Sequence, residues 1–307
     1  MPKPFDILMA GEINPDLILS GDVEPVFGQV EKWIDRAEMT IGSSSAIAAC
    51  GAATLGLKVA FVGICGDDLF GHFMLHAMQA KGIDVSAVSV RKDQSTGISV
   101  ILNRQTDRAI LTFAGLIPAL QAEHISDELL RLARHLHVAS YFLQTQLQAG
   151  IVSLFKRAHG LGLTVSLDTN WDPSGEWQGF DQLLPYVDVF LPNENEALAL
   201  THTEHVDEAL TRLGHLCPAV AIKQGASGAV AYQQGVLARV EALSMQVVDT
   251  VGAGDSFDSG FLYGYLHQWP VGKSLRLASV CGSLSTQAAG GTNAQPTYEE
   301  AMHYVRE

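Results

Sequence analysis

The residue types most suited to chemistry lie near the end of the chain, at residues 248–261. Gly252, Ala253 and Gly254 are small enough to let successive backbone N–H groups point in one direction. A helix-compatible run follows from Asp255, and the first turn of a helix adds unpaired amides and the positive end of its dipole. Such a corner predicts an anion site.

The presence of Asp255 next to a predicted anion site needs an explanation. A carboxylate repels a bound phosphate, but a general base that takes a proton from an attacking hydroxyl must stand beside the line of phosphoryl transfer. Aspartate is also a favoured helix cap, so a capping role is the alternative. The small-residue helix face behind it, with Ser256, Ser259 and Gly260, favours the interpretation of Asp255 as a base.

Short apolar strands alternate with helical segments along the chain, and these elements must position the corner. The predicted strands cover residues 5–10, 58–63, 137–140, 163–167, 187–191 and 220–222. Alternation with short glycine-containing links indicates a parallel sheet with helices on both faces. Ligands of such sheets bind at the carboxyl ends of the strands. Four further segments predict a small separate sheet, at residues 17–19, 36–41, 97–102 and 109–113.

Composition limits the classes of partner. The 307 residues carry a formal charge of −14, so we expect neither a nucleic acid nor an anionic membrane surface as partner. No apolar run is long enough to span a membrane. The four cysteines are scattered without a C-x-x-C pair, which is typical of reduced thiols in a cytoplasmic protein.

Residues 249–257 resemble the signature of the ribokinase family, the phosphofructokinase-B type of sugar and nucleoside kinases. The family pattern D-T-x-G-A-G-D-x-F is matched at every fixed position. The resemblance implies a doubly wound, mostly parallel α/β sheet flanked by helices, in one kinase domain over residues 1–307. It also implies a small β lid over the sugar, formed by residues 13–41 and 96–113.

The activity that the resemblance implies is ATP-dependent phosphorylation of a hydroxymethyl group on a sugar. Asp255 is then the base, and the amides of Gly252, Ala253 and Gly254 hold the charge that develops on the phosphoryl group. The implied sugar contacts are Asn14, Asp16, Gly42, Ser43 and Asn170. The family usually has an asparagine at the position of Ile47, and a branched aliphatic side chain cannot bind a hydroxyl, so the sugar contacts differ here.

The resemblance also implies residues for the cofactors, which are ATP and Mg²⁺. Asn193 and Glu196 match an N-x-x-E motif that orders Mg²⁺ through water, although a helix start rich in caps and acids has the same pattern. Asp249 is the candidate ligand for a monovalent cation such as K⁺. The implied nucleotide contacts are Asn193, Lys223, Gly225, Gly228, Thr250 and Ser279.

Three functions remain open at this stage. The first is a sugar kinase, the second is a nucleoside kinase of the same fold, and the third is a catalytically silent regulator that binds a nucleotide or a sugar. An intact Asp255 and an intact glycine corner argue against the third. The expected partners are a small sugar, ATP and a second copy of the chain joined through the lid.

Overall fold

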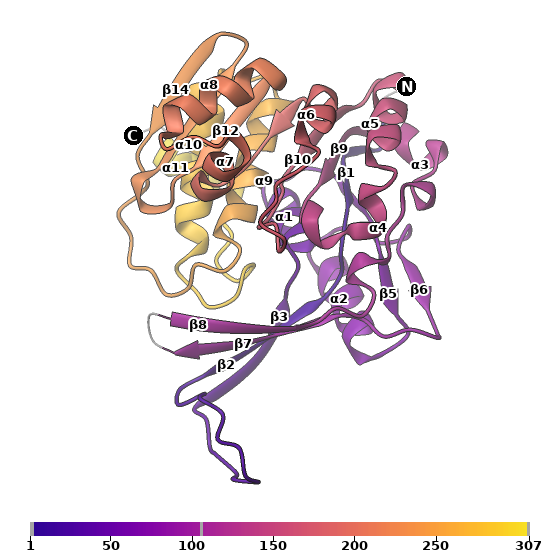
Figure 1. Cartoon of the computed structure of the whole chain (residues 1–307), viewed down its shortest axis with the longest axis vertical. Coiled ribbons are helices and arrows are strands. Elements are labelled where there is room, and N and C mark those ends of the chain that lie inside the picture. Colours follow the sequence, from indigo (N-terminus) through magenta and orange to yellow (C-terminus); the bar gives the residue numbers. More distant parts are fainter. Residues whose placement is uncertain (1–2, 105–106, 306–307) are drawn as a thin grey trace.

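A computed structural model describes residues 3–104 and 107–305. Within them the main sheet has eight strands in the order β14-β13-β12-β11-β10-β9-β1-β4 (Figure 1). The strands from β12 to β4 in this order run parallel, and β13 and β14 are antiparallel. Their bounds are β1 Phe5–Ala10, β4 Val59–Val62, β9 Ala133–Val138, β10 Thr164–Leu167, β11 Val189–Phe190, β12 Ala219–Lys223, β13 Ala229–Gln233 and β14 Val236–Val240.

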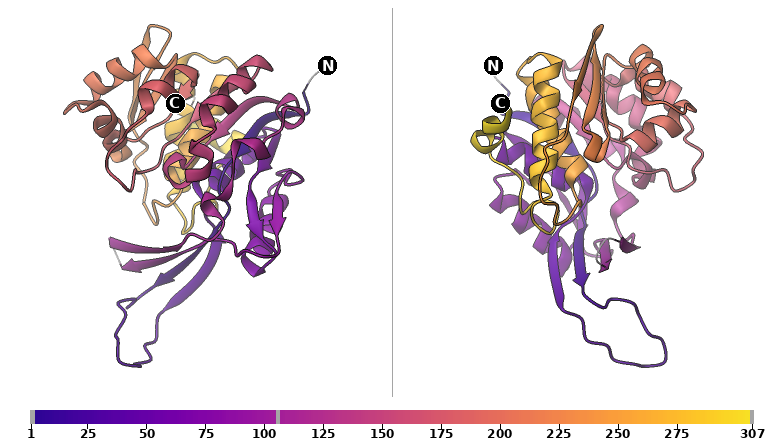
Figure 2. Two further views of the ribbon diagram at one scale, coloured as in Figure 1. Left: turned by 45° about the vertical axis from the view of Figure 1, so that its right-hand side comes forward. Right: turned by 90° about the vertical axis from the view of Figure 1, so that its left-hand side faces the viewer.

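Helices cover both faces of this sheet (Figures 1 and 2). One face buries apolar side chains of α3 Asp127–Arg131, α4 Thr145–Gln148, α5 Ile151–Gly160, α6 Phe180–Leu183, α7 Glu194–Thr201 and α8 Val206–Leu216. The other face is packed by α1 Ser44–Thr54, α2 Leu69–Ala80, α9 Ala253–Leu266 and α10 Val271–Ser285, with α11 Tyr298–Val305 outside α10. The expected doubly wound architecture is confirmed.

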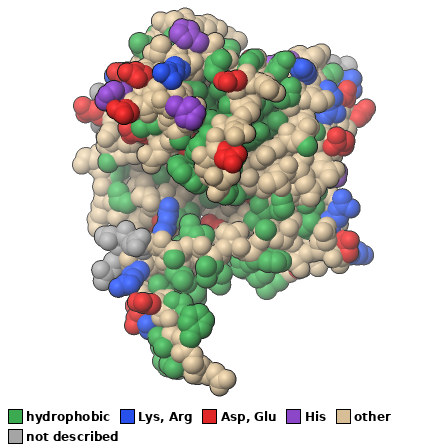
Figure 3. Space-filling view, in the orientation of Figure 1, with side chains coloured by type: hydrophobic (Ala, Val, Ile, Leu, Met, Phe, Trp, Pro, Cys, Tyr) green, Lys and Arg blue, Asp and Glu red, His purple; other side chains and the backbone are tan. Residues whose placement is uncertain are grey.

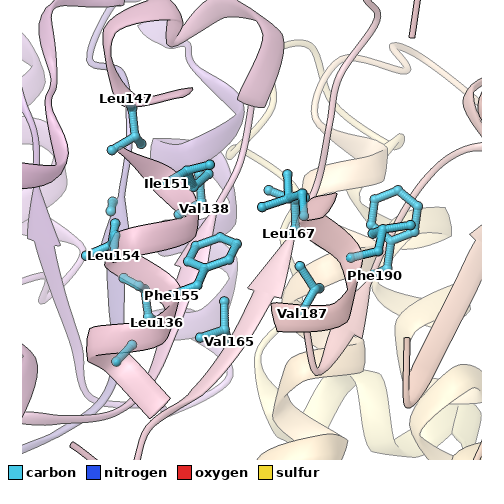
Figure 4. Packing of buried hydrophobic residues seen from close by; sticks show 14 of the residues in the cluster. Leu136, Val138, Leu147, Ile151, Leu154, Phe155, Val165, Leu167, Val187 and Phe190 are labelled. Carbon is cyan, nitrogen blue, oxygen red and sulfur yellow. The ribbon is translucent and has the colours of Figure 1, made fainter. Parts of the chain in front are cut away.

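Burial on both faces of the sheet explains why the sequences of the parallel strands are continuously apolar. Alternate residues of each strand enter opposite layers: Leu136 and Val165 meet Phe155 of α5 on one face (Figure 4), whereas Ile7 and Met9 pack on the other. Because both faces are covered, every residue of β4 is buried. This double burial is typical of parallel sheets.

A second sheet lies at one end of the main body (Figures 1 and 2). Its strand order is β3-β2-β7-β8, with β2 Pro15–Ser20, β3 Arg36–Ile41, β7 Ile98–Arg104 and β8 Asp107–Phe113. The predicted small separate sheet is therefore present. The connection at residues 21–35 extends beyond this sheet (Figure 2), and β5 Ile64–Gly66 with β6 Ser89–Arg91 forms a further two-stranded sheet.

Strands β13 and β14 extend the main sheet beyond the strands predicted from the sequence. They form a hairpin through Gln234 and Gly235, which both have positive φ angles of 49° and 89°. Two consecutive residues with positive φ suit a tight hairpin turn. The hairpin covers β12 at the edge of the sheet, and β12 ends at Lys223.

Cys50, Cys65, Cys217 and Cys281 are buried and unpaired. Among residues 3–104 and 107–305, no helix combines the length and the apolar character needed to cross a membrane.

The contact between α9 and α10 yields a stability prediction. A Cβ at Gly260 would lie 2.8 Å from the Cα of Ala278 in α10, so Gly260→Ala must push two backbones apart. We expect a loss of about 1–3 kcal/mol in the free energy of unfolding, measured by urea denaturation. Gly272→Ala on α10 is the matched control, because its Cβ would meet only Ala238 at 3.9 Å. Equal stability of the two variants would contradict this packing argument.

Candidate active site

The glycine corner forms where the chain enters α9. Gly252 has a φ angle of 72° and caps the helix. A Cβ at this position would lie 2.7 Å from the Cα of Gly291 and 2.9 Å from Cγ2 of Ile47. The backbone conformation and the close approach therefore both require glycine here. Ile47 is 3% exposed, and its aliphatic side chain packs against the backbone of Gly252 and Gly291.

Asp255 lies in the first turn of α9 and is 9% exposed. Burial raises the pKa of its carboxyl well above the usual range, the charge of Asp168 raises it further, and Lys223 opposes the rise. The hydroxyl of Ser44, at the start of α1, donates a hydrogen bond to this carboxyl. The carboxyl is thus held at the corner and is poorly solvated, which favours a strong base.

Lys223, at the end of β12, lies beside Asp255 and points into a group of carboxylates. Its Nζ is 2.7 Å from Oδ2 of Asp168, which follows β10, and 3.0 Å from Oδ1 of Asp258 in α9. The side chains of Asp168 and Asp258 are 8% and 1% exposed. One carboxylate oxygen from each of Asp168, Asp255 and Asp258 lies within 4.8 Å of the other two. The ends of two strands and one helix turn meet here.

The predicted sugar residues Asn14, Asp16 and Gly42 lie together at the start of the second sheet. Asn14 and Asp16 are 5% and 7% exposed, and a Cβ at Gly42 would lie 2.2 Å from Oδ1 of Asp16. The Asn14 amide also reaches the Ser99 hydroxyl of β7 at 3.5 Å. Burial raises the pKa of Asp16 to about 7, with a further rise from Asp249 and an opposing effect of Arg108.

Two predicted sugar ligands have local partners. The Ser43 hydroxyl donates to the Glu12 carbonyl at 2.7 Å and accepts the Ala46 amide at 3.0 Å, which makes Ser43 the cap of α1. The Asn170 side chain donates to the Ser140 hydroxyl at 3.4 Å, while the Asn170 backbone amide donates to the Asp168 carboxylate at 3.0 Å. Both side chains are engaged with the protein, so their availability to a sugar is lower than that of Asn14 and Asp16.

A pocket of about 520 Å³ lies on the other side of the corner. Six predicted residues line it: Lys223, Gly225, Gly228, Thr250, Gly254 and Ser279. Its apolar part comes from Leu243, Met245, Val247 and Phe257. Gly228 has a φ angle of 93°, and a Cβ there would lie 2.0 Å from the Val240 carbonyl oxygen, so the loop after β12 depends on this glycine.

Asn193 and Glu196 form a reciprocal cap at the start of α7. The Asn193 backbone and side chain donate to the Glu196 carboxylate at 2.9 Å and 2.6 Å, and the Glu196 amide donates to Asn193 Oδ1 at 3.0 Å. Burial raises the pKa of Glu196 to about 7, Asp168 raises it further, and Lys223 opposes the rise. The two residues therefore cap the helix, and the neighbours of the Glu196 carboxylate neutralise its negative charge only in part.

Asp249 joins the corner to the loop after α10. Its Oδ1 accepts the Val251 amide at 3.0 Å and its Oδ2 accepts the Gly290 amide at 2.9 Å. Arg108 of β8 approaches Oδ1 at 3.9 Å. The carboxylate therefore closes the loop of the corner and faces the second sheet.

Four features escaped the sequence prediction. Ser44 contacts the Asp255 carboxyl, and Asp258 pairs with Lys223. The Glu12 carboxylate accepts a hydrogen bond from the Ser45 hydroxyl, at the start of α1, at 2.7 Å. The fourth is the apolar pocket wall at residues 243–247. Asp258 stands three residues after Asp255 on a helix, and this spacing was the available signal because such residues share a face.

Comparisons with known proteins identify the family of the chain. A family model described as pfkB family carbohydrate kinase matches residues 7–298. Ribokinase of Haemophilus influenzae is 26% identical over 317 residues, covering 99% of this chain and 99% of the relative. The 5-dehydro-2-deoxygluconokinase of Geobacillus thermodenitrificans is 26% identical over 324 residues, covering 99% and 94%.

The fold is that of a solved ribokinase. The structure of Arabidopsis thaliana ribokinase complexed with ribose and ATP superimposes with a TM-score of 0.84 at 22% identity, covering 99% of each chain. The family model spans the strands and helices that build the glycine corner, the pocket and the second sheet. The chain belongs to the pfkB family and is an ATP-dependent carbohydrate kinase.

Proposed function

We propose that the enzyme transfers the γ-phosphoryl group of ATP to a hydroxymethyl group of a sugar bound between the second sheet and the glycine corner. One observation carries this assignment. The buried Asp255 carboxyl lies at the corner with the 520 Å³ pocket on one side, and Ser44 links it to the helix start next to Gly42 and Asp16. Donor site, base and acceptor site are therefore contiguous.

Asp255 is the base in this proposal. It takes the proton of the attacking hydroxyl as the oxygen bonds to phosphorus. A carboxyl with a raised pKa is the stronger base and serves this step better at neutral pH. The amides of Gly252, Ala253 and Gly254 face the charge that develops on the transferred group.

The pocket fits ATP with Mg²⁺. Leu243, Met245 and Val247 offer an apolar wall for a base, while Gly225 and Gly228 allow the backbone to approach phosphates. Asn193 and Glu196 would hold Mg²⁺ through water, which suits an ion that dehydrates reluctantly. The buried, incompletely compensated Glu196 carboxyl fits a nearby dication. Mg²⁺ supplies neutralisation of the charge on the phosphates.

For a monovalent cation such as K⁺, Asp249 is the proposed ligand. Each of its carboxylate oxygens accepts one backbone amide and keeps a lone pair for a further partner. A cation there would add positive charge next to the corner. Replacing K⁺ by Na⁺ in the assay addresses this assignment directly.

The acceptor is proposed to be a sugar rather than a nucleoside. Asn14 and Asp16 would offer an amide and a carboxyl to neighbouring hydroxyl groups, whereas Ser43 and Asn170, the other proposed contacts, also bond to Glu12 and Ser140. We propose that the second sheet, within residues 13–41 and 96–113 of one kinase domain, acts as a lid over this sugar. Because the reaction consumes ATP and the cysteines are unpaired thiols, we propose a cytoplasmic location.

The first test of this function combines a substrate panel with Asp255→Asn. Ketoses, aldoses and nucleosides are assayed with ATP and Mg²⁺, and we expect phosphorylation of a sugar. Asp255→Asn should lower kcat at least ~10²-fold, the low end for loss of a general base, with little change in binding of ATP or sugar. A nucleoside as the preferred substrate would replace the sugar assignment, and kcat within a few-fold of wild type would remove Asp255 from the mechanism.

The second test separates the anion corner from the fold. A Cβ at Gly254 would meet only Lys223, at 3.6 Å or more, so Gly254→Val is expected to keep the melting temperature near that of wild type. Its side chain would push the phosphoryl group off the amides, and loss of one such contact costs ~2.7–4 kcal/mol of transition-state stabilisation. Gly252→Ala, strained by its φ of 72°, should lose stability as well as turnover. If Gly254→Val unfolds, Gly254 is needed for packing, and the proposed role of the corner in binding the phosphoryl group is contradicted.

The third test concerns the proposed homodimer through the lid. The loop at residues 21–35 and strand β8 expose large apolar side chains: Val26, Phe27, Val30, Trp33, Ile110, Leu111 and Phe113 (Figure 3). Phe27 and Trp33, both in this loop, are 95% and 85% exposed, and exposed apolar surface of this size supports an interaction site.

The variant Phe27→Asp with Trp33→Asp should therefore be monomeric. Light scattering measures its mass against wild type at matched concentration. Leu237→Asp, at an exposed position of β14 in the main sheet, is the control and should keep the dimer mass. A monomeric wild type would refute the proposed dimer.

A further inference from the structure

The buried Lys223 faces more carboxyl groups than one ammonium can neutralise. Its Nζ contacts Oδ2 of Asp168 at 2.7 Å and both oxygens of Asp258 at 3.0 Å and 3.1 Å. Asp255, the base in the proposed function, has an oxygen within 4.8 Å of both of these carboxyl groups. Lys223 is thus held by two aspartates and stands next to the third.

The geometry of this group shows which carboxyl groups hold the ammonium. Asp168 and Asp258 each have an oxygen within 4.8 Å of the other, and both contact Lys223 Nζ. The ion pair with Asp168 has the shorter of the two distances, and Lys223 lowers the pKa of Asp168 against the effect of burial. Within residues 3–104 and 107–305, no ion pair joins Lys223 to Asp255.

We propose that Asp168 and Asp258 are positioning residues for phosphoryl transfer, which hold the Lys223 ammonium away from Asp255 so that the base stays unpaired. The proposal rests on the proposed function of Asp255. A salt bridge to Lys223 would favour the charged form of Asp255 and weaken it as a base. The two aspartates prevent this, because they hold the ammonium at 2.7 Å and 3.0 Å through their carboxylate oxygens.

The location of Lys223 makes this restraint necessary. Its Nζ would lie 3.6 Å from a Cβ at Gly254, the residue before Asp255, so the ammonium is already under the glycine corner. It also lines the proposed nucleotide pocket. Its pKa is raised by Asp168 first among its charged neighbours, then by Asp258 and Glu196, against the effect of burial. The charge is thus compensated mainly within the protein rather than reserved for a phosphate.

The groups that face Asp255 come from every element packed around it. They are Glu12 after β1, Ser44 of α1, Asp168 after β10, Lys223 of β12 and Asp258 of α9 itself. His137 of β9 lies next to Asp168 and Lys223, and burial lowers its pKa to about 4, so it is neutral across the assay range. Of these groups, Asp168, Lys223 and Asp258 are the ones that the test changes.

The test removes both restraining carboxylates and then the lysine. In Asp168→Asn with Asp258→Asn, the carboxylates that remain near Lys223 are Asp255 and Glu196. We expect the acidic limb of kcat/KM, where activity is lost as Asp255 takes up a proton, to move to lower pH by about one to three units. The plateau should fall because the base is weaker. Adding Lys223→Met to this variant should return the limb towards its wild-type position and raise the plateau.

A purely structural group would lower the melting temperature of the double variant and leave the pH profile in place. An unmoved acidic limb in the folded double variant therefore overturns the proposal. Asp258→Asn alone should keep the limb near wild type, because its amide still accepts from Lys223 and Asp168 keeps the charge. The control for loss of a lysine is Lys273→Met, at a side chain stacked over Trp269 on the protein surface.

The single variant Lys223→Met decides the question if the double variant does not fold. When the ammonium only needs restraint, its removal leaves KM for ATP within a few-fold of wild type. Removal of the ammonium takes away a charge that lowers the pKa of Asp255, so the acidic limb should stay in place or move to higher pH. A rise of KM for ATP by about tenfold or more would instead make Lys223 a phosphate ligand and overturn the proposal.

One readout is independent of turnover. The pH titration of the Asp255 carboxyl can be followed by ¹³C NMR of aspartate-labelled protein, with the signal assigned by its loss in Asp255→Asn. The midpoint should fall in the double variant and recover in the triple variant. A wild-type protein that phosphorylates no sugar would refute the proposed function and still leave this titration to decide the role of the two aspartates.

Discussion

The central constraint on this structure is electrostatic, because in the proposed mechanism a carboxylate has to stand beside the phosphate that it helps to transfer. The fold meets it by burying Asp255 in the first turn of α9, at the positive end of the helix, where desolvation raises the pKa of the carboxyl. Neither feature acts alone. Amides without a base would bind the anion, and an exposed carboxylate would remain a weak base and a repulsive charge.

The parallel sheet supplies the other groups because its strands end at one edge. Asp168 follows β10, Asn193 follows β11, and Lys223 ends β12, so three adjacent strands deliver a carboxylate, an amide and an ammonium to the same corner. Their neighbours along each strand are buried on both faces, which fixes the strand ends. The position of each polar group thus follows from apolar packing elsewhere in the strand.

The sequence predicted what depends on local pattern. The strand–helix alternation predicted the main sheet, and the glycine corner predicted the start of α9 within two residues of Asp255. It did not predict contacts set by tertiary packing. Nothing local to Ser44 or Asp258 says that one faces Asp255 and the other faces Lys223. The hydrogen bond from the Ser43 hydroxyl to the Glu12 carbonyl likewise joins residues 31 positions apart. The pattern at Asn193 and Glu196 suits a cap and a metal site equally, and the structure shows the cap.

Ile47 shows how a departure from the family pattern can be absorbed by packing. An asparagine there would offer an amide to a sugar hydroxyl, whereas the isoleucine lies against Gly252 and Gly291, with Cγ2 and Cδ1 filling the space that a Cβ on either glycine would need. An aliphatic side chain at this place supports the backbone whose amides form the corner. In the proposed sugar site, recognition then falls more heavily on Asp16 of β2 and on Asn14, which directly precedes β2, than on α1. The proposal therefore couples substrate choice to the position of the second sheet.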